Sequence, residues 1–200
     1  IQDVLQPMRA LYLRMPAVAT LVLAVGAGYL IGGVRSALVV AALTLFIALS
    51  PWWDRALVTL YMATFGVVIS CLIGFTVGTL CFQNKKSAAF MLGVCDIFQT
   101  FPSFVYLIPV MMLFGITDTS VLIAVIVYAT IPATRYTIEG LRSVPVGLHE
   151  AATMSGVNKF QRLTKIEFPL AFPHMMLGLN QTIVFALFMV IIGAFIGTED

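Results

Sequence analysis

The stretch 168–198 reads FPLAFPHMMLGLNQTIVFALFMVIIGAFIGT and contains no Asp, Glu, Lys or Arg. A helix needs about 20 mostly apolar residues to cross about 30 Å of hydrocarbon, so this stretch is long enough for one membrane span. A transmembrane strand would alternate apolar and polar side chains, whereas residues 183–192 are apolar on every side. The stretch therefore predicts a membrane helix, which we place after Pro173.

The rest of the chain has the same character, with 60% hydrophobic and 10% charged residues. Soluble domains carry about 45–50% apolar and about 25% charged residues, so the surrounding solvent must be lipid. We predict an all-α, polytopic transmembrane helical bundle of six spans. The five earlier charge-poor stretches are 15–34, 36–53, 56–84, 87–115 and 119–134. We divide the chain into an N-terminal pair of helices, 1–56, and a core, 57–200, which contains a cytoplasmic loop at 135–169.

The distribution of cations predicts the orientation of these spans. Cytoplasmic loops carry an excess of Lys and Arg. With loop 135–169 inside, the inner side has eight cations and the outer side has three, namely Arg9, Arg14 and Arg55. This places the start of the chain outside. The inner cations are Arg35, Lys85, Lys86, Arg135, Arg142, Lys159, Arg162 and Lys165. The net charge of +2 is too small and too dispersed for a nucleic-acid-binding protein.

Small residues recur every fourth position in the third stretch, at Gly66, Ser70, Gly74 and Gly78. Such a stripe lets a neighbouring helix approach closely, and we interpret it as helix packing. The three cysteines stand in apolar runs without ligand spacing, so no metal site is predicted.

The fourth stretch contains Asp96 and two prolines, Pro102 and Pro109, which predict a kinked helix. Asp96 lies about 15 Å of helix rise beyond Lys86, so it should face protein or a wet cavity. It either locks the bundle through hydrogen bonds or lines a polar pathway. The candidate pathway residues are Asp96, Gln99, Thr100, Ser103, Tyr106, Asn180 and Gln181. Interhelical hydrogen bonds explain Asn180 and Gln181 equally well.

The loop predicts a short helix over 148–155, which Pro145 and Gly147 precede and Gly156 ends. We expect it to expose Ala151, Ala152 and Met154 and to insert into a groove of another protein. The alternative is a helix that rests on anionic lipid headgroups. A second amphipathic piece follows over 159–166, and Pro169 and Pro173 should stop it before the last span.

The pattern Glu150-Ala151-Ala152-x3-Gly156-x9-Ile166-x-Phe168-Pro169 resembles the EAA-x3-G-x9-I-x-L-P signature of membrane subunits of bacterial ATP-binding-cassette importers, with Phe168 in place of Leu. The resemblance implies a type I permease-like fold whose loop docks on an ATPase subunit as a coupling helix. The implied coupling residues are Leu148, Glu150, Ala151, Ala152, Met154, Ser155 and Gly156.

A narrower resemblance rests on Asp96-x-x-Gln99-Thr100-x-Pro102-x-Phe104-Val105-Tyr106-Leu107-Ile108-Pro109 and on 178–182. These residues are similar to permeases of glycine betaine, proline betaine and choline uptake, to which trimethylamine N-oxide carriers are related. The resemblance implies a permease in the bacterial inner membrane for such a compatible solute. It also implies cytoplasmic ATPase subunits, a second permease copy and an external or periplasmic substrate-binding protein.

No phosphate-binding loop of the Gly-x4-Gly-Lys-Ser/Thr type occurs in this sequence, so we expect no cofactor on this chain and ATP and Mg on the partner ATPase. A catalytic role is not expected, because no nucleophile and base stand at a suitable spacing. The alternatives are a permease of the same class for amino acids or another small solute, and an ion-coupled secondary transporter that uses Asp96.

Overall fold

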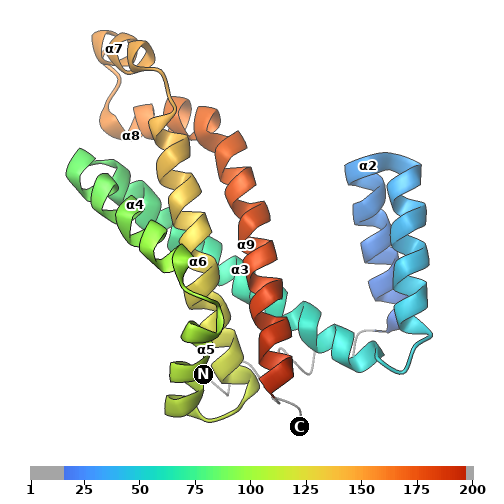
Figure 1. The fold of residues 1–200 in the computed structure, drawn as a ribbon. Helices are drawn as coiled ribbons and strands as arrows, with labels where there is room; N and C mark the ends of the chain where they lie inside the picture. The colour runs from blue at the N-terminus through green and yellow to red at the C-terminus, as the bar shows by residue number, and fades with distance from the viewer. Residues whose placement is uncertain (1–15, 197–200) are drawn as a thin grey trace. The chain divides into compact units, whose positions relative to one another are not determined.

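The computed structural model describes residues 16–196, except for the side chains of His149 and Thr153. Every regular element within that range is helical, as predicted. In chain order these are α2 (Ala17–Ala48), α3 (Trp53–Phe82), α4 (Lys85–Thr100), α5 (Phe104–Phe114), α6 (Asp118–Arg142), α7 (Val146–Met154), α8 (Lys159–Arg162), the π-helix η1 (Leu163–Glu167) and α9 (Phe168–Ile196), shown in Figure 1. The chain forms two compact units, which divide between Met62 and Ala63.

In the first unit, α2 is a helical hairpin. Gly32 and Gly33 have non-helical backbone angles, and Gly33 has a φ of 66°, a left-handed conformation that suits glycine. A Cβ added at Gly28 would lie 3.1 Å from a methyl carbon of Val40, so the two arms of the hairpin pack against each other. The first two predicted spans correspond to these arms. Arg9 and Arg14, and part of the predicted N-terminal pair, lie outside the described residues.

In the second unit, α6 is the central helix. Its fully buried residues include Ala124, Val125, Ala129 and Ile138, and α9 lies alongside it (Figure 1). A Cβ on Gly193 would lie 2.7 Å from the Val121 side chain, so glycine permits this close approach. Gly197, which the sequence pairs with Gly193 in a Gly-x3-Gly pattern, lies outside the described residues.

The small-residue stripe of α3 packs against α6, which confirms its predicted role. The hydroxyl of Ser70 donates a hydrogen bond of 3.1 Å to the carbonyl oxygen of Ile126. A Cβ on Gly74 would lie 2.5 Å from that of Ala133, and one on Gly78 would lie 2.7 Å from that of Thr137. The two backbones therefore approach closely along several turns.

The fourth predicted span is broken. The axes of α4 and α5 meet at 86°, at the short segment that contains Pro102, while Pro109 remains inside α5. Proline has no N–H to donate, which favours a helix end there. Four helices of the described chain are long and apolar enough to cross a membrane, and five are counted if the α4–α5 pair is one span. Six spans were predicted; the number differs because Ala17–Ala48 is counted here as one helix, although Gly32 and Gly33 divide it into two arms.

The prediction that Pro169 and Pro173 separate the loop from the last span is wrong. Both prolines lie within α9, which follows η1 without a break. Pro169 has no N–H to donate to a carbonyl of the preceding turn, and it stands just after the π-helical turn of η1, where the helical bonding pattern changes. The π-helical turn joins α8 to α9, so Lys159–Ile196 forms one uninterrupted helical segment.

Candidate functional site

The candidate pathway begins at the C-terminal end of α4. The side chain of Asn84 accepts a hydrogen bond of 3.0 Å from the backbone N–H of Lys86 and caps the start of this helix. Asp96 and Gln99 are three residues apart and therefore share one face of α4. The helix ends one residue after Gln99, so both side chains stand next to the break in the span.

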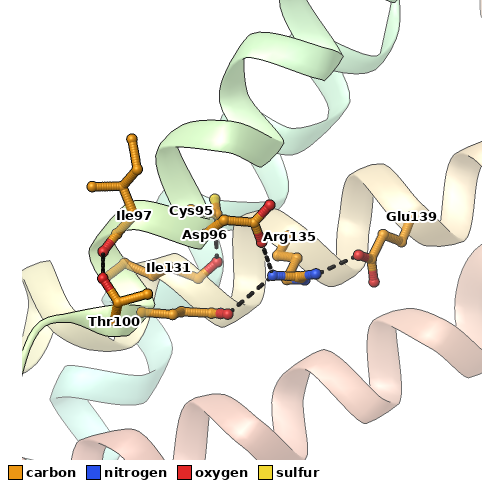
Figure 2. Close-up of polar contacts among 8 residues, drawn as sticks. Cys95, Asp96, Ile97, Thr100, Ile131, Arg135 and Glu139 are labelled. Carbon is orange, nitrogen blue, oxygen red and sulfur yellow. Dashed lines mark hydrogen bonds and ion pairs between the residues drawn. The ribbon is translucent and has the colours of Figure 1, made fainter.

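Arg135 of α6 joins these two residues in one polar network. Its guanidinium pairs with the carboxylate of Asp96 and donates a hydrogen bond of 3.1 Å to the amide oxygen of Gln99. Its Nε donates at 3.0 Å to the carboxylate of Glu139, one turn further along α6. Figure 2 shows Arg135 between the two carboxylates. The network has two negative charges and one positive charge, and the Asp96 side chain is 59% exposed.

Arg135 and Glu139 are functional candidates that the sequence analysis missed. The predicted cytoplasmic loop begins at Arg135, but α6 continues to Arg142, so both residues lie on this helix. The helical spacing of four between an arginine and a glutamate was a usable signal, because such residues are neighbours on a helix. By contrast, no pattern in the sequence indicated that Arg135 would pair with Asp96, which lies 39 positions away.

An aromatic row lies beside the break. The hydroxyl of Tyr106 donates a hydrogen bond to the carbonyl oxygen of Phe98 across the bend. The ring of Tyr106 lies 6.1 Å from that of Phe98 and 5.1 Å from that of Tyr128, and Tyr128 stacks on Phe185 at 4.7 Å. These contacts join α4, α5, α6 and α9. Tyr106 is buried, so its ring serves packing, whereas Phe98 is exposed.

The remaining candidate pathway residues do not join the Arg135 network. Thr100 donates to the carbonyl oxygen of Ile97 in its own helix at 2.7 Å, and Ser103 is buried. Asn180 is exposed and Gln181 half-buried on α9, and neither has a hydrogen bond to the network in the part of the chain that the structure describes. The candidate site therefore consists of Arg135 and the residues that contact it, Asp96, Gln99 and Glu139.

The predicted coupling helix is α7, and Gly156 follows it with a φ of 72°. The backbone N–H of Val157 donates at 3.1 Å to the carbonyl oxygen of Ala152, a pattern typical of a glycine-terminated helix. Met154 is 90% exposed and Ala151 is also exposed, as predicted. The expectation that Ala152 is exposed is wrong: it is 5% exposed, because the helix turns this methyl toward its own chain.

The other proposed coupling residues lie on the outside of the same segment. Leu148, Glu150 and Ser155 are exposed. The Ser155 hydroxyl donates at 2.9 Å to the carbonyl oxygen of Ala151. Among the described residues no group of three or more His, Cys, Asp or Glu side chains is arranged to hold a metal ion.

Comparison with protein families matches residues 70–200 to the family described as binding-protein-dependent transport system inner membrane component. The matched region contains the Arg135 network, α7 and the last span.

Three relatives are informative. The chain is 89% identical over 200 residues to the trimethylamine N-oxide transport system permease protein of Pelagibacter ubique, covering 100% of this chain and 28% of the relative. It is 47% identical to the protein of that name from Ruegeria pomeroyi, covering 98% of this chain and 30% of the relative. It is 33% identical to the glycine betaine/proline betaine transport system permease protein of Escherichia coli, covering 96% of this chain and 54% of the relative. The chain thus spans less than a third of the length of the first two relatives.

Proposed function

Because this chain belongs to the family of inner membrane components of binding-protein-dependent transport systems, we propose that it forms the membrane pathway of an ATP-driven importer for a small solute with a trimethylated nitrogen. The 89% identity to a trimethylamine N-oxide permease carries this proposal. Glycine betaine and choline carry the same trimethylated group, and the former is in the name of the relative from Escherichia coli. The proposed location is the bacterial inner membrane, with the segment 143–167 in the cytoplasm.

The proposed partners follow from the same family. ATP and Mg would bind to cytoplasmic ATPase subunits, and an external or periplasmic binding protein would deliver the solute. A second copy of the permease would complete the pathway. The network supports this arrangement, because a carboxylate at membrane depth that is 59% exposed in one chain has to face water or another protein rather than lipid.

We propose that α7 transmits closure of the ATPase subunits to the bundle. The exposed side chains of Leu148, Ala151 and Met154 form an apolar surface on a short helix, which suits a groove on a partner. Ala152 would act indirectly by fixing α7 on its own loop.

The test of this docking role is a charged substitution in the full-length protein within its transport complex. Met154→Glu should abolish the stimulation of ATP hydrolysis by solute, because a desolvated carboxylate in the interface is unfavourable. Thr164→Glu adds the same charge to an exposed position of the same loop outside α7 and is the control. Equal stimulation in the two variants would refute docking through α7.

For the pathway, we propose that Arg135 and Asp96 contact the solute in passage. Arg135→Gln and Asp96→Asn should each reduce transport while the complex still assembles and hydrolyses ATP at its basal rate. Leu113→Asn, a polar change at an exposed position of α5 outside the network, is the control for membrane insertion. If assembly and transport are lost to the same extent in both network variants, the network is a structural lock only.

The rival function is ion-coupled transport through Asp96. The contact with Arg135 disfavours this function, because an ion bound at Asp96 would have to compete with the guanidinium for the carboxylate. Proteoliposomes that contain the complex with an ATPase subunit unable to hydrolyse ATP separate the two functions. We expect no uptake from these vesicles, and uptake driven by an ion gradient would overturn the proposal.

A further inference from the structure

The second unit contains a cavity of about 430 Å³ between the end of α3 and the turn formed by α8 and η1. Phe82 and Gln83 line it from the α3 side, and Lys159, Phe160 and Arg162 line it from the α8 side. The volume lies within the range of about 300–1,000 Å³ that is typical of small-molecule sites. Neither the Arg135 network nor α7 contributes a residue to this cavity.

The wall of the cavity contains a fixed ion pair. Nε of Arg162 donates at 2.9 Å to a carboxylate oxygen of Glu167, which is 2% exposed. A guanidinium has five N–H donors, so it can hold this carboxylate and an oxygen of a ligand together. The π-helical turn of η1 brings Glu167 to this position, and π-helical turns occur frequently at functional sites.

The cavity is electropositive. Lys159 is exposed at its edge, so the lining has two cations and one anion. Lys85 and Lys86 begin α4, which starts two residues after Gln83, and the Arg142 guanidinium donates at 3.3 Å to the carbonyl oxygen of Lys85. An anion is therefore the ligand that the charge at this end of the bundle favours.

The depth of the cavity indicates the source of that anion. Phe82 is the last residue of the membrane helix α3, and η1 leads directly into the membrane helix α9. The cavity thus lies where a membrane helix meets water, at the level of lipid headgroups. Phe160, which is largely exposed beside the two cations, offers an apolar surface to the glycerol and acyl region of a lipid.

From this combination we infer that the cavity binds the phosphate of an anionic phospholipid headgroup, with Lys159 and Arg162 as the phosphate ligands. Basic pockets at the cytoplasmic ends of membrane helices are known to hold such headgroups. The site is separate from the solute pathway, and its test does not depend on which solute the protein transports.

The experiment uses the full-length protein in its complex, purified with native lipid, and native mass spectrometry to count retained phosphatidylglycerol. Lys159→Gln should reduce the affinity for phosphatidylglycerol about fivefold, the effect of one cation near an anionic membrane surface. Lys165→Gln is the matched control, since Lys165 is an exposed lysine of the same segment that does not line the cavity. Solute-stimulated ATP hydrolysis of each variant confirms that the complex is folded.

Three results would overturn the inference. Equal losses of lipid in the two variants would show diffuse surface attraction instead of a site. Equal retention of phosphatidylcholine and phosphatidylglycerol would show that the anionic charge of the headgroup is not recognised. Displacement of the lipid by inorganic phosphate at a similar concentration would assign the cavity to a soluble anion.

Discussion

Gly74 provides a quantitative test of the packing that holds α6, and with it Arg135, in place. A Cβ added at Gly74 would lie 2.5 Å from the Cβ of Ala133 and 2.9 Å from the backbone nitrogen of Thr134. Two carbon atoms prefer a separation of about 3.5–4.0 Å, so Gly74→Ala requires α3 and α6 to move apart by about 1 Å. Ala133 is fully buried and the nitrogen of Thr134 is backbone, so neither atom can yield alone.

Overpacking of this kind costs about 1–3 kcal/mol of folding free energy. Alanine is favoured over glycine in a helix by about 1 kcal/mol, which offsets part of that cost. Both neighbouring atoms are rigid, so we take the upper half of the overpacking cost, about 2–3 kcal/mol, and subtract the helix-propensity gain of about 1 kcal/mol. We therefore expect Gly74→Ala to lower the folding stability by about 1–2 kcal/mol. Gly93→Ala in α4 gains the same helix propensity, and its new Cβ meets no atom within 4 Å.

The assay is thermal unfolding of the full-length protein in detergent, with the two glycine variants measured beside the unchanged protein. Gly74→Ala should lower the apparent Tm by a few degrees, and Gly93→Ala should leave it equal or raise it. If the two variants are equally stable, α3 and α6 do not pack at the observed distance and the reasoning fails.

Three further predictions concern the loop and the break in the fourth span. Gly156→Ala places a side chain on a backbone with a φ of 72°, which costs about 1–2 kcal/mol, so solute-stimulated ATP hydrolysis should fall. Gly147→Ala, in open space, should leave that activity unchanged, and equal losses would contradict a role for the left-handed turn. Glu167→Gln weakens the bond to Arg162 by about 1.5–3 kcal/mol and should lower the Tm; an unchanged Tm would contradict this. Tyr106→Phe removes the hydrogen bond across the bend, worth about 1 kcal/mol, and should speed amide exchange at Phe101 and Ser103, whereas unchanged exchange at these two residues would show that this hydrogen bond does not hold the bend.

The fold class followed from the sequence because the solvent imposes it. In lipid every backbone polar group has to bond within the chain, so long apolar stretches have to be helical. The stripe of Gly66, Ser70, Gly74 and Gly78 predicted close packing for a similar reason, since only small side chains allow two backbones to approach. The helix ended by Gly156 was equally predictable, because glycine tolerates a positive φ at no steric cost.

The polar site required the tertiary structure. Asp96 was predictable as a buried or pathway charge, but its partner Arg135 was assigned to the loop, because a count of charges along the chain does not show how far a helix extends. Ala152 was assigned to the docking surface, because its rotation about α7 depends on what the loop packs against. Whether Pro169 ends a helix likewise depends on the turn that precedes it.

What the sequence alone determined about this protein is therefore what lipid and local backbone geometry dictate: helices, their small-residue faces and the glycine turn of the loop. The tertiary structure decided which charges meet across two helices, which alanine faces inward and at which of its two prolines the fourth span bends. The physical reason is that a contact between residues 96 and 135 depends on the rotation and crossing of two helices, which the packing of the whole unit sets.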